Sequence, residues 1–310
     1  MKKTFLIFII TAILISFSGS CIKGNPKDWP KETMYDLEVF RYAPQNPTMI
    51  MAWHFDVMLH DPDYGEQILA EASKEGNSIN DLIPFYEKLD YIHGMTLYNT
   101  SADFSNMHGD LQKMAILFSV EMDKAALLEY IRKESAPGMI KEYKGITLVS
   151  TSMTNTIAIL TDKKLLVGDV EVIKSIIDGN TMASGQSRYC SLSENSMMYL
   201  YVDVEEIYND KLSKNEIDLD DEDDLRMKQV GLIEFALNID TVEATLETAI
   251  QTSLTEIAQI EKLEKEFKEG FMSFFDFSKS ELERTVEPWG YRFLQKIDRQ
   301  MFYASMIEDM

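Results

Sequence analysis

The sequence contains few cysteines and few histidines, the residues that most often build disulfides and metal sites. Its 310 residues include two cysteines, Cys21 and Cys190, and four histidines, His54, His60, His93 and His108. At most one cysteine pair is available, which excludes a disulfide-rich scaffold. The zinc spacings Cys-x-x-Cys and His-Glu-x-x-His are both missing.

Motifs of catalytic sites are missing as well. The sequence has no Gly-x-Ser-x-Gly, Walker A or Gly-x-Gly-x-x-Gly pattern, and no Ser-x-x-Lys after residue 21. These absences leave serine nucleophiles, phosphate sites and dinucleotide sites without support. We therefore expect a chain without a cofactor, and a binding protein more than an enzyme.

Positive charge is also scarce. Lys and Arg number 30 against 52 Asp and Glu, which gives a formal net charge of −22. Such a surface repels phosphate backbones, so nucleic acid is not expected as a partner. A hydrophobic content of 45% with 11% aromatic residues is typical of a packed core.

One apolar run stands out, at the N-terminus. Lys2 and Lys3 precede an apolar stretch over 5–17, which is followed by Ser18-Gly19-Ser20 and then Cys21. This order is typical of an export signal, and the stretch is shorter than the ~20 residues of a membrane span. A cysteine after small residues indicates a lipoprotein signal, although such signals more often carry leucine where Ser18 stands. An ordinary cleaved signal, with Cys21 as an incidental thiol, is the alternative.

We expect residues 1–20 to be removed, Cys21 to carry fatty acyl chains such as palmitate, and residues 21–30 to form a tether. Each buried acyl methylene contributes about 0.8 kcal/mol, so several chains would hold the protein on a membrane. This predicts a lipid-anchored protein of the bacterial cell envelope, on a periplasmic or outer-membrane face. Cys190, without a partner in the chain, is then a buried apolar residue or a dimer thiol.

The sequence of the mature chain predicts a duplicated body. The runs 46–57 and 193–204 are both rich in strand-forming residues, and both end in Asp-Val, at Asp56 and Asp203. Each is followed by a helical or loop segment, a strand pair and a helix. The predicted ranges are 64–89, 94–98, 113–120 and 123–134 in the first copy, and 204–228, 231–237, 244–250 and 253–275 in the second. Asp123 and Ser253 are suitable N-cap residues for the two last helices.

Between the copies we expect strands over 144–150, 156–160 and 165–168 and a helix over 170–177. Residues 279–310 are predicted to be helical, because apolar residues recur there at spacings of three and four. This apolar stripe consists of Leu282, Val286, Trp289, Phe293, Ile297 and Met301. The predicted fold is α+β, with two similar halves (31–192 and 193–278), mainly antiparallel sheets, helices packed on one face and a C-terminal helical segment.

The order of a strand at Tyr143-Lys144-Gly145-Ile146, a strand at Leu166-Val167-Gly168, a helix and a further strand resembles that of a loose group of uncharacterised bacterial lipoproteins. Members of that group share an export signal and a duplicated α+β body. The resemblance implies this architecture and a location in the cell envelope. It supplies no catalytic residues.

Two clusters are weak candidates for metal ligands. His54, His60 and Asp63 lie close together in sequence, but Tyr201 takes the place of His54 in the second copy, which is what an ordinary strand residue would show. The acidic segment 218–224, with Asp220 and Glu222, lacks the glycine and glutamate of a calcium-binding EF-hand loop. We therefore expect a solvated acidic loop and no specific metal site.

A methionine-rich apolar cleft between the two halves, covered by the segment around Trp289, is a candidate ligand site. The leading hypothesis is a membrane-anchored envelope lipoprotein that binds a protein or an apolar ligand without catalysis. The alternatives are an envelope hydrolase with a dispersed active site and a structural component of an envelope assembly.

The lipid anchor predicts a chemical difference between two variants. Metabolic labelling with a fatty acid should mark the wild-type chain and leave Cys21→Ser unlabelled, because only the cysteine thiol can be acylated. Equal labelling of the two would contradict the lipoprotein interpretation.

Overall fold

The computed structural model describes most of the chain after the tether. The described residues are 30–34, 38–72, 86–101, 111–136, 138–151, 155–182, 189–217, 227–271 and 281–308. The signal segment, Cys21, His108 and the acidic segment with Asp220 and Glu222 lie outside them. No helix in the described part of the chain is long and apolar enough to span a membrane.

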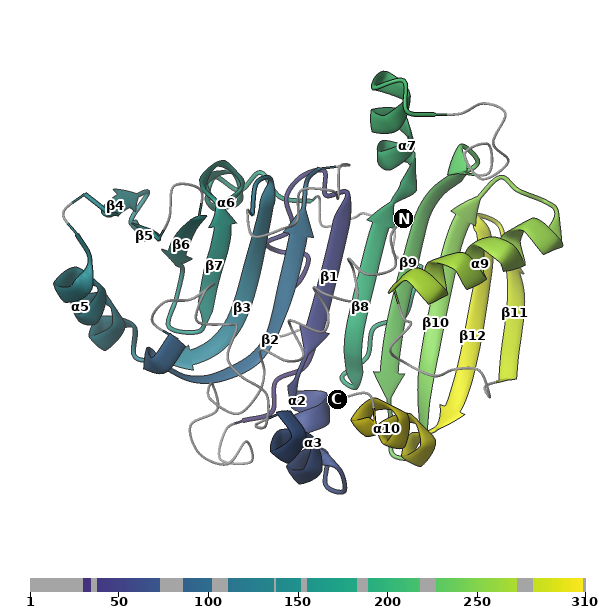
Figure 1. Cartoon of the computed structure of the whole chain (residues 1–310), viewed down its shortest axis with the longest axis horizontal. Coiled ribbons are helices and arrows are strands. Elements are labelled where there is room, and N and C mark those ends of the chain that lie inside the picture. The colour runs from purple at the N-terminus through teal and green to yellow at the C-terminus, as the bar shows by residue number, and fades with distance from the viewer. Residues whose placement is uncertain are drawn as a thin grey trace.

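All twelve strands belong to one open antiparallel sheet (Figure 1). The first half supplies β1 (Met49–His54), β2 (Leu89–Asn99), β3 (Met114–Met122), β4 (Ile140–Tyr143), β5 (Ile146–Ser150), β6 (Asn155–Ile159) and β7 (Lys164–Asp169). The second half supplies β8 (Ser196–Asp203), β9 (Val230–Ile239) and β10 (Glu243–Thr252), and the C-terminal segment adds β11 (Glu281–Glu287) and β12 (Gly290–Asp298). The order across the sheet is β11-β12-β10-β9-β8-β1-β2-β3-β7-β6-β5-β4.

The two halves meet through their first strands. β1 and β8 pair antiparallel, from Met49 opposite Val202 to Trp53 opposite Met198. β2 and β3 then follow on one side and β9 and β10 on the other, so the halves are arranged alike about this central pair. The predicted pair of similar α+β halves is confirmed. The expected apolar cleft between them is wrong, because backbone pairing between β1 and β8 closes the sheet there.

Both faces of the sheet are covered. On one face the buried cluster includes Met49, Met51 and Trp53, and on the other it includes Ile50 and Ala52, as the alternation of a strand requires. The helices are α2 (Asp56–Leu59), α3 (Gly65–Ala72), α5 (Lys124–Glu134), α6 (Val170–Ile177), α7 (Val204–Ser213), α9 (Ile257–Phe271) and α10 (Arg299–Glu308), with a short 3-10 turn at Tyr86–Lys88. Buried side chains of all of these α-helices except α6 join the first cluster. α6 packs on the opposite face.

Aspartates mark the starts of three helices. The Asp123 side chain accepts a hydrogen bond from the Ala126 amide at the start of α5, as predicted. Asp169 and Asp203 cap α6 and α7 in the same way. Ser253 is not a cap, because its amide pairs with Gln229 and α9 begins only at Ile257.

The C-terminal segment differs from the prediction. Residues 281–298 form the hairpin β11–β12, and only α10 is helical. In β12 the side chains of Tyr291, Phe293 and Ile297 are buried. They are two and four residues apart, so all three lie on one face of a strand, and the four-residue spacing alone also fits a helix. Pairing of β12 with the edge of β10 that β9 does not occupy decides the outcome. Leu282 and Val286 of the expected stripe are consequently exposed on β11.

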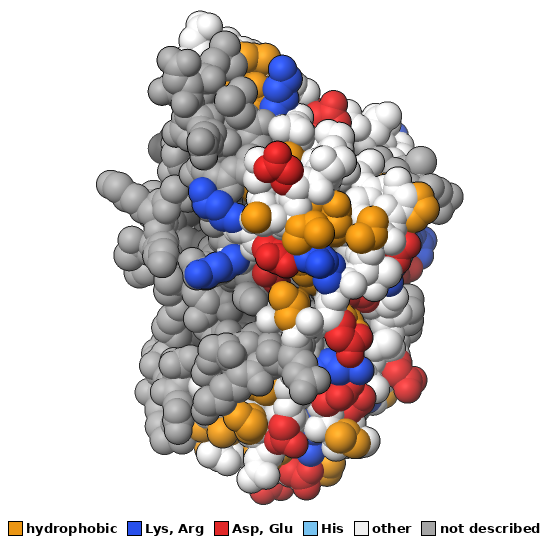
Figure 2. Space-filling view, turned by 90° about the vertical axis from the view of Figure 1, so that its right-hand side faces the viewer, with side chains coloured by type: hydrophobic (Ala, Val, Ile, Leu, Met, Phe, Trp, Pro, Cys, Tyr) orange, Lys and Arg blue, Asp and Glu red, His pale blue; other side chains and the backbone are white. Residues whose placement is uncertain are grey.

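β11 is one edge of the sheet. Figure 2 shows this side of the molecule, where charges of both signs lie among scattered apolar side chains. Arg284 on β11 pairs with Glu261 of α9 across the surface. Charged side chains on an edge strand discourage pairing with another chain.

The packing of β7 against β3 requires a glycine. Gly168 has φ +153°, and a Cβ built there would lie 2.3 Å from the carbonyl oxygen of Met114 on β3. Gly168→Ala should therefore lower the free energy of unfolding by about 1–3 kcal/mol, since the strands must separate to admit the methyl group. Gly145, in the turn between β4 and β5, has a positive φ but open space around it. Gly145→Asn is the control, because asparagine tolerates this conformation, and equal losses measured by urea unfolding would contradict the account.

Candidate functional site

The site begins with a buried carboxylate where β1 ends. Asp56, in the first turn of α2, is fully buried. Its oxygens accept hydrogen bonds from the Glu32 amide (2.8 Å), the Tyr91 hydroxyl (2.9 Å) and His93 Nδ1 (2.8 Å). Burial by itself would raise the pKa of Asp56, but the neighbouring histidines and these donors hold it well below its usual value. Asp56 is therefore an anion that joins the N-terminal segment to β2.

His93 carries this interaction to the next strand. Its Nε2 lies 3.2 Å from Glu121 Oε1 on β3 and 3.9 Å from Glu32 Oε1. Burial would lower the pKa of His93, yet the hydrogen bond to Asp56 and the surrounding carboxylates raise it above the ordinary histidine value. The ring is fully buried and points its two nitrogens at carboxylates on opposite sides.

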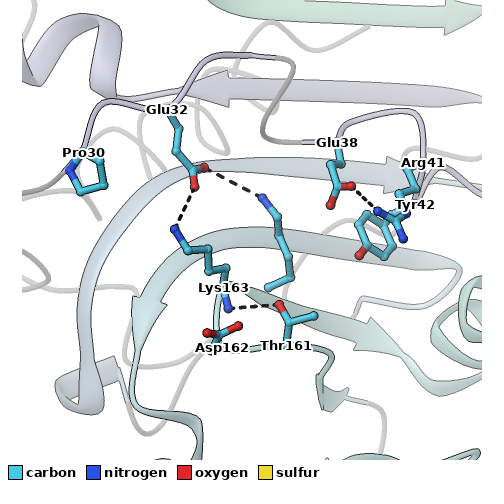
Figure 3. A pocket seen from close by; sticks show the side chains of 9 residues that line it. Pro30, Glu32, Glu38, Arg41, Tyr42, Thr161, Asp162 and Lys163 are labelled. Atoms are coloured by element: carbon cyan, nitrogen blue, oxygen red, sulfur yellow. Dashed lines mark hydrogen bonds and ion pairs between the residues drawn. The ribbon is translucent and has the colours of Figure 1, made fainter.

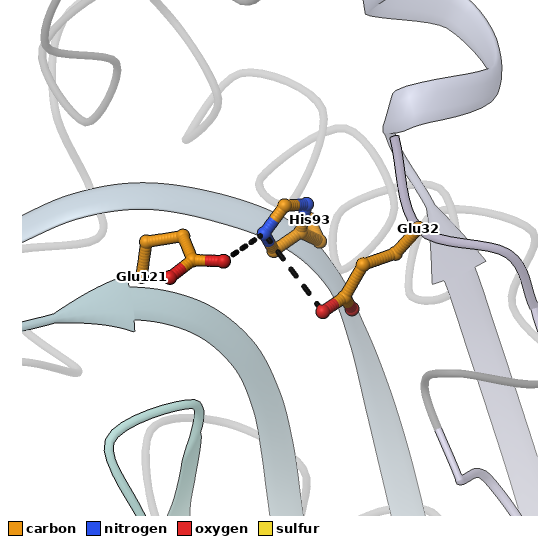
Figure 4. A group of neighbouring side chains, drawn as sticks. All are labelled: Glu32, His93 and Glu121. Carbon is orange, nitrogen blue, oxygen red and sulfur yellow. Dashed lines mark hydrogen bonds and ion pairs between the residues drawn. The ribbon is translucent and has the colours of Figure 1, made fainter. Parts of the chain in front are cut away.

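Glu32, His93 and Glu121 together offer one ligand atom each, all within 4.8 Å of one another (Figure 4). They come from the N-terminal segment, β2 and β3. The imidazole nitrogen and both carboxylates point toward a common space between the strands and the N-terminal segment. Among the described residues these three side chains form a group whose ligand atoms are close enough together that it can hold a metal ion.

Two lysines lie against the same carboxylates. Lys163 Nζ is 2.9 Å from Glu121 and 3.9 Å from Glu32, and its side chain is 47% exposed. Lys164 Nζ is buried, donates to Ser119 Oγ at 2.7 Å and lies 4.0 Å from Glu32. Ser119 in turn donates to Glu32 Oε2. The cluster is thus a charge network in which Lys163 is the exposed cation and Lys164 the buried one.

A surface groove of about 510 Å³ opens beside this network (Figure 3). It is lined by Pro30, Glu32, Glu38, Arg41, Tyr42, Thr161, Asp162, Lys163 and Lys164. Glu32, Lys163 and Lys164 belong to both the groove and the network. Across the groove, Arg41 pairs with Glu38. The wall is therefore charged, with cations and carboxylates in equal number.

The sequence-predicted candidates fall in different places. His54 Nε2 and His60 Nε2 each lie 3.9 Å from an oxygen of Asp56, so both belong to the surroundings of the buried carboxylate. Neither ring nitrogen of His54 has a hydrogen-bond partner among the described residues. Asp63 lies apart from them and pairs with Arg299 of α10 at 2.8 Å.

Arg299 links the C-terminal helix to the first half. It also binds both oxygens of Asp61, at 2.6 and 2.7 Å. Its guanidinium lies over the rings of Tyr64 and Tyr303, which stack with centroids 4.5 Å apart. Asp63 is therefore part of a structural contact between α10 and the start of α3.

Cys190, at the end of the first half, makes its contacts with β9 and β10 of the second half. It is buried, its amide donates to Glu234 at 2.8 Å, and burial raises the pKa of its thiol well above the usual value. A buried, protonated thiol is unreactive. This agrees with the interpretation of Cys190 as a buried apolar residue.

Sequence reasoning did not single out Glu32, Asp56, His93 and Glu121 as a site. They are separated by up to 89 positions, and no local spacing connects them. The available signal was weaker, namely the polar residues His93 and Glu121 within otherwise apolar strands. Such residues need partners when buried.

Comparisons with known proteins give no family. No family model matches the chain, and no curated protein matches it. Solved structures of the Treponema protein TP0453 are similar at low level. Crystal forms III and I share 12% identity, cover 87% of this chain and 97% of theirs, and give TM-scores of 0.44 and 0.43. Crystal form IV shares 13% identity, covers 92% of this chain and 100% of its own, and gives a TM-score of 0.44. Similarity this remote carries no functional argument.

The Asp56–His93 pair predicts a pH-dependent stability. Because the pKa of His93 is raised on folding, its contribution is complete below about pH 6.5 and is lost as pH rises through the raised value. The contribution of Asp56, whose pKa is lowered, is present above about pH 3.9 and is lost in stronger acid. His93→Gln should cost about 3–5 kcal/mol near pH 6 and less near pH 9.

His60→Gln serves as the matched control. Burial lowers the pKa of His60, so the stability lost on its replacement should increase with pH, opposite to His93. The measurement is urea unfolding of both variants and wild type at pH 6 and pH 9. A loss for His93→Gln that is the same at both pH values would contradict the ion-pair assignment.

Proposed function

We propose that this chain is a lipid-anchored protein of the bacterial cell envelope whose body binds a polar segment of a partner protein without catalysis. The observation that carries the proposal is the charged groove beside the Asp56–His93 network. The N-terminal signal and Cys21 support the anchor, and the −22 net charge of the chain supports attachment through acyl groups more than through basic side chains.

The charges of the groove favour a ligand of mixed polarity. Arg41 and Lys163 have side chains that are 70% and 47% exposed, so both ammonium and guanidinium groups are accessible from solvent. Glu38 and Asp162 stand beside them. On a strongly acidic molecule, two accessible cations next to carboxylates form a local pattern that a peptide with both charge signs can match. An apolar ligand would leave these charges without compensation.

Binding agrees with the groove better than hydrolysis does. The residues that line it include no serine, cysteine or histidine within the described part of the chain. The hydroxyl of Thr161 accepts a hydrogen bond from the Lys163 amide, and in the described part of the chain no hydrogen bond joins it to the neighbouring carboxylate of Asp162. A hydroxyl nucleophile requires a base within hydrogen-bond reach.

Photo-crosslinking in living cells tests the groove. A photoreactive amino acid at Thr161, which is exposed in the groove, should give a defined adduct with an envelope protein. Arg41→Glu should abolish that adduct, because it reverses an accessible charge. The matched control position is Val242, which is 69% exposed in the second half.

An adduct of equal yield from Val242, or none from Thr161, would contradict binding in the groove. A turnover in a broad hydrolase screen that a single groove substitution abolishes would favour the enzymatic alternative instead.

A further inference from the structure

We propose that Glu32, His93 and Glu121 form a binding site for one divalent transition-metal ion of the Zn²⁺ class, at the inner end of the groove. The inference goes beyond the proposed function and is independent of it, because neither the lipid anchor nor a partner segment supplies a ligand. The donor set and its geometry carry it.

The donors suit this class of ion. One imidazole nitrogen and two carboxylate oxygens within 4.8 Å of one another can converge on a single ion. Zn–N distances of about 2.0–2.1 Å and Zn–O distances of about 2.0–2.2 Å place the ligand atoms of a tetrahedral ion about 3.3–3.5 Å apart. His93 Nε2 lies 3.2 Å from Glu121 and 3.9 Å from Glu32, so the two glutamate side chains must move closer together around the ion. Calcium prefers six to eight oxygen ligands, which this set does not offer. The imidazole therefore selects for a transition metal.

The orientation of His93 is the second observation. Its Nδ1 is held by Asp56 at 2.8 Å, which leaves Nε2 directed at the two glutamates. A carboxylate that fixes the far nitrogen of a histidine is the usual arrangement behind a metal ligand. Asp56 itself is held by Tyr91 and the Glu32 amide, so the ring has one defined orientation before any ion binds.

The charge of the site also matches a divalent ion. Glu32, Glu121 and Asp56 contribute three negative charges, which Lys164, Lys163 and the doubly protonated His93 ring balance when no ion is bound. A divalent ion replaces two of these positive charges, because the Nε2 proton of His93 is released to solvent and one lysine moves away. Lys163 is then the residue that must leave, and its 47% exposed side chain can turn into the groove. Lys163 thus competes with the metal for Glu121.

Three protein ligands leave one coordination position of a tetrahedral ion open. Because Glu32 lines the groove, an ion bound to this carboxylate can be reached from it. Water or an anionic group of a bound ligand can occupy the position. A ligand in the groove that supplied this anionic group would then be linked through the metal to His93 and Asp56.

Calorimetric titration with ZnCl₂ tests the site. The full chain is purified without a histidine tag, in detergent, and titrated in excess Mg²⁺ so that the acidic segment 218–224 does not contribute. We expect one Zn²⁺ per chain. Glu121→Gln should weaken binding at least roughly tenfold, and Lys163→Met should strengthen it, because the competing ammonium is removed.

Glu38→Gln is the matched control, since Glu38 lies in the same groove but outside the ligand set, and it should leave the affinity unchanged. Circular dichroism verifies folding, and Glu32→Gln replaces Glu121→Gln if the latter does not fold. No Zn²⁺ binding by wild type, undiminished binding by the glutamine variants at Glu32 and Glu121, or unchanged affinity in Lys163→Met would each overturn the proposal.

Discussion

A single buried anion, Asp56, determines how the first half is organised. A carboxylate without solvent contact is tolerated only when its charge is balanced and its oxygens are hydrogen-bonded. Asp56 meets this requirement through Tyr91 and His93 on β2 and the amide of Glu32 before β1. The same contacts fix the N-terminal segment against the sheet and set the orientation of His93. The groove and the proposed metal site therefore both depend on this carboxylate.

The second half uses the same framework with different polar groups. Asp203, the last residue of β8 and the counterpart of Asp56 in the duplicated pattern, caps α7 and is only partly buried. The buried carboxylates of the second half include Glu234 and Glu247, which accept hydrogen bonds from the amides at 189–191. Glu247 also pairs with Arg292 of β12 at 2.7 Å. The duplicated strand order thus supports one half with a histidine network and one half without.

The framework was largely predictable from sequence, and the site was not. Strand and helix order follow from local apolar periodicity, which is why β1, β3 and α5 lie where they were predicted. The hairpin before α10 was missed because the spacing of Phe293 and Ile297 matches a helix and a strand equally, and only pairing with β10 separates the two. The Asp56–His93 network requires contacts between segments that are distant in the chain. The register of β2 against β3, with its bulges, brings these segments together, and local sequence patterns do not reveal that register. The pairing of β1 with β8, which joins the two halves into one sheet, likewise depends on tertiary contacts that local sequence patterns do not reveal.

The most direct test of the account is the state of the His93 ring, observed by nitrogen-15 NMR of the metal-free protein at neutral pH. Held between Asp56 and Glu121, the ring should show protons on both Nδ1 and Nε2, and the Nδ1 proton should persist well above the pH at which free histidine titrates. A His93 ring that titrates like free histidine, or that carries no proton on Nδ1, would contradict the claim that Asp56 orients it.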